Sequence, residues 1–199
     1  LHVRSRRQRQ MCIRDRWYAG RDMLRPVTGG SSASDIHIHQ QETPVMVPIR
    51  SLGPSYRERI TQHLLQLEPA DRYLRFGYAA NDEQIRRYAE QLNFERDEIF
   101  GIYNRRLELI AMAHLAFSEN PEHKPCAEFG VSVLKQARGR GFGARLFERA
   151  VMHARNEGVN MVFIHALSET TAMLKIARNA GATVRRDGSE SEACLLYTS

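Results

Sequence analysis

Residues 131–147, VSVLKQARGRGFGARLF, decide the fold of this chain. The β-branched residues at their start favour a strand, and the run that follows the glycines is typical of an amphipathic helix. Gly139, Gly141 and Gly143 lie between the two and let the backbone turn sharply with its N–H groups uncovered. The first turn of the helix adds unpaired N–H donors and the positive end of the helix dipole. The sequence therefore predicts a loop that can hold a phosphate or pyrophosphate.

Two arginines in the same loop, Arg138 and Arg140, can add charge-assisted hydrogen bonds to such an anion. The other interpretation is a tight strand-to-helix turn without a ligand, because a glycine-rich loop on its own is a weak signal. Strand, glycines, arginines and helix follow one another in a single order here. This order favours the anion site.

The two ends of the chain, residues 1–16 and 194–199, resemble translated sequencing-adapter read-through, and we expect neither segment to be native. Residues 1–16 are not a secretory signal, because no apolar core follows their charges, although their arginines leave a transit peptide open. They hold six arginines and one aspartate, and therefore five of the six net positive charges. The rest of the chain is nearly neutral and offers no basic face for nucleic acid.

Cysteine and histidine usage argues against disulfides and metals. Cys12 and Cys194 lie in the two end segments, which leaves Cys126, and one cysteine makes neither a disulfide framework nor a metal site. His37 and His39 have no further ligand beside them, so we expect solvated loop histidines. No apolar run has the length of a membrane span. We therefore expect a cytoplasmic protein without metal, membrane or nucleic acid among its partners.

Composition and periodicity predict a disordered leader and linker over residues 1–44 and one folded domain over residues 45–199. Pro48 suggests that the first strand of the domain lies at a sheet edge. The predicted elements are a strand at 45–50, a helix at 56–67, a short helical segment from Pro69, a helix from 81 to 92, strands at 98–103, 107–118 and 127–134, a helix that follows the glycine loop and runs to about 157, a strand at 159–167, a helix at 170–180, and strands at 183–186 and from 191 onward.

The order of these elements predicts an α/β (α+β) fold. The three consecutive strands without an intervening helix should be antiparallel, whereas the helix that follows the glycine loop implies parallel pairing of 127–134 with 159–167. We expect a mixed, mostly antiparallel central sheet of six to seven strands with helices on both faces. An exposed last strand could pair with a second copy, so the chain is expected to be a monomer or a homodimer.

The loop residues 138–143, RGRGFG, match the signature arginine-or-glutamine, two spacers, glycine, spacer, glycine, and the chain resembles the GCN5-related N-acetyltransferase (GNAT) superfamily from about residue 45 onward. Three shorter pieces look like the acetyltransferase domain of bacterial protein-lysine acetyltransferases: Arg75-Phe76, AEFGV at 127–131 and AMLKIARNAG at 172–181. The resemblance implies acetyl-CoA as donor and a primary amine as acceptor, on a protein lysine or a small molecule.

The resemblance also assigns residues to acetyl-CoA. The backbone of 131–133 would pair with the pantetheine arm like an added strand, and the N–H groups of 139–144 would bind the pyrophosphate, with Arg138 at the loop entrance. Thr170 stands where the family usually has an asparagine. The full set is Val131, Ser132, Val133, Arg138, Gly139, Arg140, Gly141, Phe142, Gly143, Ala144 and Thr170.

Acyl transfer to an amine requires a neutral amine, and therefore a base that removes a proton from the ammonium. Glu128 matches the glutamate of the subgroup motif and is the predicted catalytic base; the other interpretation is a surface or salt-bridged carboxylate. Many superfamily members protonate the departing thiolate with a tyrosine in the last helix, where this chain has Ala177. Solvent could supply that proton, and His165 and Ser168 are further candidates.

Two other functions stay open at this point. Gly139, Gly141 and Ala144 also satisfy G-x-G-x-x-A, the pattern of dinucleotide-dependent oxidoreductases. Against that function, few parallel βαβ units fit into the chain, and Glu157 closes a helix rather than a strand. The third possibility is a non-catalytic acyl-CoA sensor, which the missing tyrosine supports.

Overall fold

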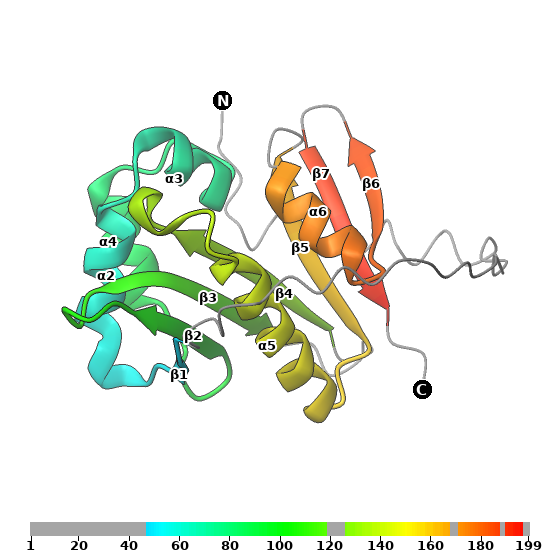
Figure 1. The fold of residues 1–199 in the computed structure, drawn as a ribbon, viewed down its shortest axis with the longest axis horizontal. Coiled ribbons are helices and arrows are strands. Elements are labelled where there is room, and N and C mark those ends of the chain that lie inside the picture. The colour runs from blue at the N-terminus through cyan, green and yellow to red at the C-terminus, as the bar shows by residue number, and fades with distance from the viewer. Residues whose placement is uncertain (1–46, 119–125, 168–170, 188–189, 197–199) are drawn as a thin grey trace, which may run out of the picture. The chain divides into compact units, whose positions relative to one another are not determined.

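Apolar side chains cover both faces of the central strands, so helices pack on each side of the sheet. The structure is a computed structural model, and it describes residues 47–118, 126–167, 171–187 and 190–196. Its seven strands are ordered β1-β2-β3-β4-β5-β7-β6 (Figure 1). Their bounds are β1 Ile49–Ser51, β2 Glu98–Tyr103, β3 Leu109–Phe117, β4 Cys126–Val133, β5 Met161–Leu167, β6 Thr183–Asp187 and β7 Glu190–Leu196.

The helices divide between the two faces. Because side chains alternate along a strand, neighbouring residues of β4 point in opposite directions. Phe129 packs edge-on against Phe147, with ring centroids 5.1 Å apart, whereas Ser132 contacts His63 on the opposite face. The helices are η1 Pro54–Tyr56, α2 Arg57–Leu65, α3 Pro69–Phe76 and α4 Asp82–Glu90 between β1 and β2, and η2 Lys135–Ala137, α5 Phe142–Asn156 and α6 Thr171–Asn179 after β4.

Strand directions follow the expectation from the sequence. β1 to β4 form an antiparallel meander, β4 and β5 pair in parallel, and β7 pairs antiparallel with both β5 and β6. The mixed, mostly antiparallel sheet with helices on both faces is therefore confirmed. Within the described residues, β4 and β5 are the one parallel pair. That topology is not the doubly wound sheet of a dinucleotide-binding oxidoreductase.

The short helix predicted from Pro69 is confirmed: it starts with proline in its first turn and ends at Gly77, a residue in the left-handed conformation with φ of 76°. The structure corrects one expectation. The last strand is not an edge strand, because β7 lies between β5 and β6 and buries Cys194 and Leu195 there. The sheet edges are β1, as expected from Pro48, and β6.

Several predictions fall outside the described residues, among them the leader over 1–44. In the ranges that the structure does describe, every helix is too short or too polar to span a bilayer.

The contact between Phe129 and Phe147 joins the central strand to α5, and both rings are almost wholly buried. We expect Phe129→Ala to lower the free energy of unfolding by roughly 3–5 kcal/mol, because the substitution leaves a cavity between sheet and helix. Met152→Ala on the exposed side of the same helix should change it by less than about 0.5 kcal/mol. Urea unfolding followed by circular dichroism measures both, and equal losses in the two variants would contradict the assignment of the core.

Candidate active site

The parallel pair of β4 and β5 separates halfway along the sheet. Residue pairing runs from Cys126↔Met161 to Phe129↔Ile164 and stops there. Both strands nevertheless continue, β4 to Val133 and β5 to Leu167. The β5-facing side of β4 beyond Phe129 therefore has no strand paired with it in the described residues. Figure 1 shows the two strands diverging toward the end of the sheet where α3 lies.

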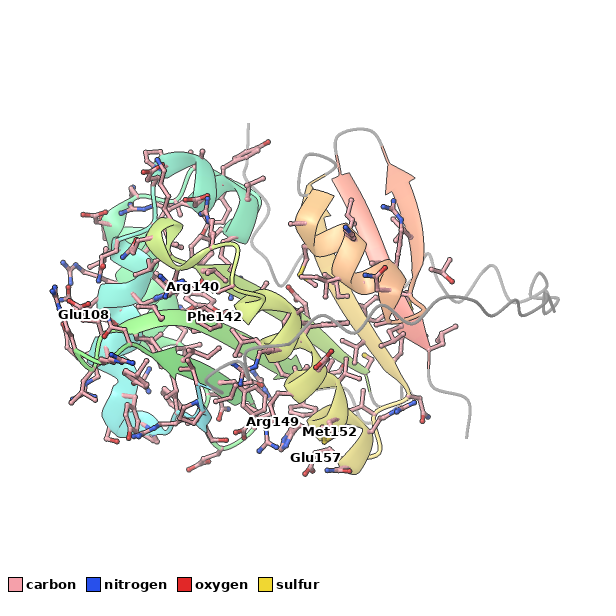
Figure 2. The ribbon with its side chains drawn as sticks, viewed as in Figure 1. Glu108, Arg140, Phe142, Arg149, Met152 and Glu157 are labelled. Atoms are coloured by element: carbon pink, nitrogen blue, oxygen red, sulfur yellow. The ribbon has the colours of Figure 1, made fainter. Side chains whose placement is uncertain are left out.

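The glycine-rich loop lies at the far end of this open stretch and is anchored at both ends. Ala137 and Phe142 are buried, while residues 138–141 between them are exposed. Gly139 and Gly141 have φ of 75° and 73°, in the left-handed region that glycine tolerates best. Figure 2 labels Arg140 and Phe142 where the loop enters α5.

Gly141 is the N-cap of α5, and no side chain caps the helix. The first N–H groups of a helix have no acceptor within the helix, and here they belong to Phe142, Gly143 and Ala144. A Cβ on Gly139 or Gly141 would meet no atom within 4 Å, so the backbone of the loop is open to a ligand. Uncovered N–H groups at the positive end of a helix dipole suit a phosphate group. The residues present therefore fit the pyrophosphate of a nucleotide.

Two ion pairs join the loop to α3. Asp71 lies 2.6 Å from the guanidinium of Arg138, and the carboxylate of Glu68 lies 3.0 Å from the ammonium of Lys135. Arg138 also donates from Nε to the carbonyl oxygen of Val133 over 3.2 Å. Arg138 thus ties the end of β4 to α3. Arg140 is exposed as well, and the ion pairs found between described residues do not include it.

Glu128 lies on β4, on the face of the sheet covered by α2, α3 and α4. It is 7% exposed, and its β4 neighbours on that face are Gly130 and Ser132. Phe163 is its partner residue on β5. Glu128 therefore precedes by two residues the first β4 residue that is not paired with β5.

The hydroxyl of Ser132 is held by a buried histidine. His63 Nδ1 donates to the carbonyl oxygen of Leu109 over 2.7 Å, so Nε2 accepts from the Ser132 hydroxyl over 2.8 Å. Burial lowers the pKa of His63 from 6.5 to about 4, against the opposing effect of the Leu109 hydrogen bond and with a further lowering by the charge of Arg75. His63 is therefore neutral at physiological pH.

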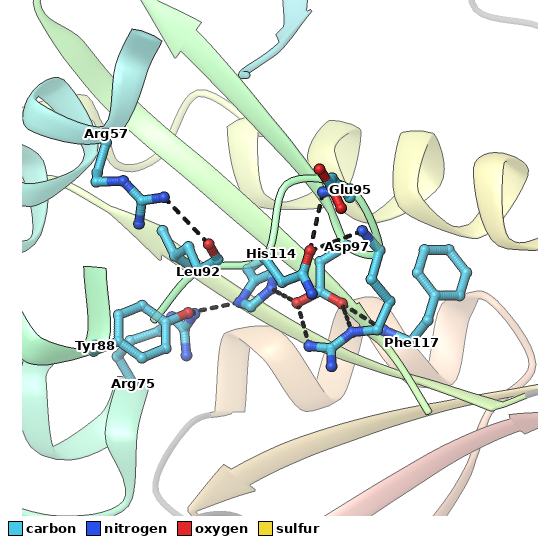
Figure 3. Close-up of polar contacts among 10 residues, drawn as sticks. Arg57, Arg75, Tyr88, Leu92, Glu95, Asp97, His114 and Phe117 are labelled. Atoms are coloured by element: carbon cyan, nitrogen blue, oxygen red, sulfur yellow. Dashed lines mark hydrogen bonds and ion pairs between the residues drawn. The ribbon is translucent and has the colours of Figure 1, made fainter. Parts of the chain in front are cut away.

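A second buried polar chain crosses the same face (Figure 3). Arg75 donates to the hydroxyl of Tyr88 over 3.0 Å, Tyr88 lies 2.7 Å from Nδ1 of His114, and His114 Nε2 lies 3.0 Å from a carboxylate oxygen of Asp97. Burial acts to lower the pKa of His114, but Tyr88 and Asp97 raise it overall.

Asp97, itself buried, is the last residue of that chain. Arg96 donates to both of its carboxylate oxygens, over 2.6 and 2.9 Å, and the backbone N–H of Phe117 donates over 3.2 Å. Burial acts to raise the pKa of Asp97, but the hydrogen bonds and charges of Arg96 and His114 lower it to about 2. Asp97 therefore remains a carboxylate under all ordinary conditions.

Several residues proposed from the sequence cannot be located. Thr170 and Ser168 lie outside the described residues, and for His165 the structure describes the backbone of β5 but no side chain. Ala177 is fully buried on α6. Its methyl side chain offers no proton donor at that position. Among the described side chains, no three of His, Cys, Asp or Glu gather closely enough to hold a metal ion.

Sequence reasoning missed His63, Asp71 and His114. For His63 a signal existed, because it falls on the apolar stripe of its helix beside Ile60 and Leu64, and a histidine there is buried. Asp71 and His114 carry no such signal, since their partners lie on other elements.

A splayed parallel pair, a glycine loop and a helix N-terminus in this topology define an acetyl-CoA-dependent N-acetyltransferase. Residues 61–182 match the profile of the Acetyltransferase (GNAT) family. The chain belongs to this family, and acetyl-CoA is its co-substrate. The superfamily resemblance of the loop motif is thereby confirmed. A comparison with curated proteins gives no match.

Solved structures share the fold. The GNAT domain of S. lividans PAT is 20% identical, with a TM-score of 0.62 over 75% of this chain and 89% of that one. Ribosomal-protein-alanine N-acetyltransferase from Brucella melitensis is 14% identical, with a TM-score of 0.60 over 75% and 99%. The yncA protein of Salmonella typhimurium, whose structure holds its cofactor acetyl-CoA, is 14% identical, with a TM-score of 0.59 over 76% and 94%.

Gly141→Glu should abolish CoA binding while the protein stays folded. The new carboxylate would repel the pyrophosphate and fill the open side of the loop, and the left-handed conformation costs a non-glycine residue roughly 1–2 kcal/mol. Gly158→Glu is the matched control, because Gly158 has φ of 71° and the same open surroundings at the other end of α5. Titration calorimetry with CoA measures both variants. Unchanged affinity in Gly141→Glu would count against this loop as the binding site.

The neutral state of His63 predicts how stability depends on pH. The unfolded chain takes up a proton near pH 6.5 and the folded protein only near pH 4, so the contribution of His63 is complete above pH 6.5 and is lost as pH falls toward 4. The loss amounts to about 3 kcal/mol. His63→Gln should flatten the stability profile between these pH values. Urea unfolding across the pH range is the measurement, and parallel profiles for wild type and His63→Gln would refute the assignment.

Proposed function

We propose that this enzyme moves an acetyl group from acetyl-CoA directly to a primary amine, on a protein lysine or a small molecule, with Glu128 as the base. The observation that carries the proposal is the position of Glu128, buried on β4 two residues before β4 and β5 separate. A ligand that pairs with 131–133 and reaches the glycine loop with its phosphates would end next to this carboxylate.

Each end of acetyl-CoA has a matching feature in the chain. The open side of β4 over 131–133 offers backbone groups to the amides of the pantetheine arm, as an added strand would. The N–H groups at the start of α5 and the exposed Arg140 would hold the pyrophosphate. We assign Arg138 to the loop entrance, where its pairing with Asp71 and Val133 supports a role in fixing the loop. Thr170 stays a proposed cofactor contact.

In the proposed reaction the Glu128 carboxylate takes a proton from the ammonium of the acceptor, directly or through water. The neutral nitrogen then attacks the thioester carbonyl carbon; the C–N bond forms, the C–S bond breaks, and CoA leaves as a thiolate. The nitrogen loses its second proton as the amide forms. Because Ala177 offers no proton, the thiolate would receive one from solvent, or from His165 or Ser168. Each turnover releases one net proton together with CoA.

The acceptor and the assembly are the finer parts of the proposal. A protein lysine is one candidate, and the likeness to the GNAT domain of PAT supports it at the level of the fold. A small amine is the other. We infer a monomer or homodimer in the reducing cytoplasm, a compartment in which the free thiols of Cys126 and Cys194 persist.

Glu128→Gln should lower kcat by about 10²–10⁴-fold and leave the affinity for acetyl-CoA within about twofold, because the amide keeps the size of the side chain but accepts no proton. Glu157→Gln, at the exposed end of α5, is the control and should behave as wild type (Figure 2). Thiol release measures turnover, and calorimetry measures binding. Equal loss of turnover and affinity, or no loss of either, would refute Glu128 as the base.

A screen of the whole chain with labelled acetyl-CoA identifies the acceptor. The candidates are small primary amines, lysine peptides and folded proteins with exposed lysines, and label transfer to any of them with release of CoA supports the proposal. Binding of acetyl-CoA without transfer to any class of amine would instead contradict it.

A further inference from the structure

Arg75 on α3 and Gly130 on β4, far apart in the sequence, meet on the face of the sheet that carries Glu128. A Cβ added to Gly130 would lie 2.7 Å from Cζ and Nη1 of Arg75 and 2.8 Å from its Nη2. The guanidinium of Arg75 therefore occupies the space that a side chain at position 130 would fill. Arg75 itself is buried, with 9% of its surface exposed.

This contact places the guanidinium on the same face of β4 as Glu128, two residues further along the strand. Residues two apart on a strand share a face and lie about 7 Å apart, so Glu128 and Ser132 flank the position that Arg75 covers. On β3, His114 is the residue paired with Gly130. Gly130 is also the first β4 residue beyond the last pair with β5. The permanent positive charge of Arg75 thus lies at the point where the strands separate.

Arg75 is held in this position from the helix side. Its Nη2 donates to the hydroxyl of Tyr88 over 3.0 Å, and its guanidinium lies 5.3 and 5.6 Å from the ring centroids of Phe76 and Tyr88. Tyr88 is fixed in turn by His114 and, through it, by Asp97 (Figure 3). These contacts orient the guanidinium over Gly130 in the native structure.

The other described groups on this face cannot replace that charge. On α2, His63 is neutral, and on β3, His114 is paired with the carboxylate of Asp97. On α4, Tyr88 presents a hydroxyl, and on β5 the residue opposite Glu128 is Phe163. Among these side chains, Arg75 is the cation that keeps its charge at every pH of interest.

We propose that Arg75 is a positioning residue for catalysis: it keeps the buried Glu128 ionised and directed toward the point where β4 and β5 separate. The inference rests on the proposed function, in which Glu128 is the base. Burial by itself stabilises the protonated acid, which cannot accept a proton from an ammonium. A neighbouring guanidinium stabilises the carboxylate and so opposes that effect.

The test compares wild type with variants of Arg75 and Gly130. The quantity compared is the acid limb of the pH profile of kcat/KM, measured with one amine at saturating acetyl-CoA. Arg75→Met should move this limb to higher pH by about one unit or more and restore most of the activity at alkaline pH. Arg75→Lys keeps the charge and should keep the limb close to that of wild type. Gly130→Ala pushes the guanidinium away while leaving it in the chain, and should move the limb in the same direction as Arg75→Met.

Tyr88→Phe removes the hydrogen bond that anchors Arg75 and should give a smaller shift in the same direction. Tyr78→Phe is its matched control, because Tyr78 packs on the same Phe76 ring, and its profile should coincide with that of wild type. Thermal melts and CoA affinity verify that every variant is folded. A purely structural role of Arg75 would lower kcat/KM by the same factor at every pH.

A second measurement does not depend on turnover. The Glu128 carboxyl can be titrated by NMR in protein carrying ¹³C-labelled glutamate, with its signal assigned by its disappearance in Glu128→Gln. The pKa of Glu128 should rise in Arg75→Met and in Gly130→Ala. An unchanged pKa in both variants overturns the proposal, whether or not Glu128 is the base. If that pKa rises but Glu128→Gln leaves turnover intact, the proposed function fails and Arg75 is only a charge partner.

Discussion

The length of the pairing between β4 and β5 determines where the sheet is continuous and where it opens. Four residue pairs join the meander β1–β4 to the unit of β5, β7 and β6, and beyond Phe129 the two strands separate. Backbone hydrogen-bonding groups need partners, so an open strand side within a sheet is a place for a ligand rather than a neutral feature. The open stretch leads directly to the glycine loop. In the proposed function, this one interruption of the pairing would expose the side of β4 that receives the pantetheine arm, next to the loop that would hold the pyrophosphate.

The parts around this interruption are held rigidly by simple means. Phe129 fixes β4 to α5, while Ala137 and Phe142 anchor the two ends of the exposed loop. The ion pairs of α3 with Arg138 and Lys135 tie the loop to the other face of the sheet. Because one helix, α3, touches the loop through Asp71 and β4 through Arg75, it links the two halves of the candidate site.

The sequence predicted what local pattern determines. The strand at 98–103 has the bounds expected, and the strand directions follow from the connections between elements. The sequence could not decide which of the last two strands pairs with β5, because β6 and β7 form a hairpin in either arrangement. The structure places β7 next to β5, and this position buries Ala193 to Leu195. The length of the β4–β5 pairing depends on packing across the whole sheet.

For the candidate site, the motif indicated the loop and Glu128, but not their surroundings. The contact of Arg75 with Gly130 and the hydrogen bond of His63 to Ser132 join elements far apart in the chain. No spacing rule reaches that far. Such contacts exist once the sheet and its helices have assembled, so they become visible in the structure first.

The short pairing between β4 and β5 also has a thermodynamic consequence. A ligand that lies along β4 beyond Phe129 completes the sheet, and such a ligand binds the folded chain and not the unfolded one. By mass action the folded state then gains about 2.7 kcal/mol at a ligand concentration of about 100 times Kd. The resistance of this protein to heat or urea should therefore follow the supply of its own co-substrate.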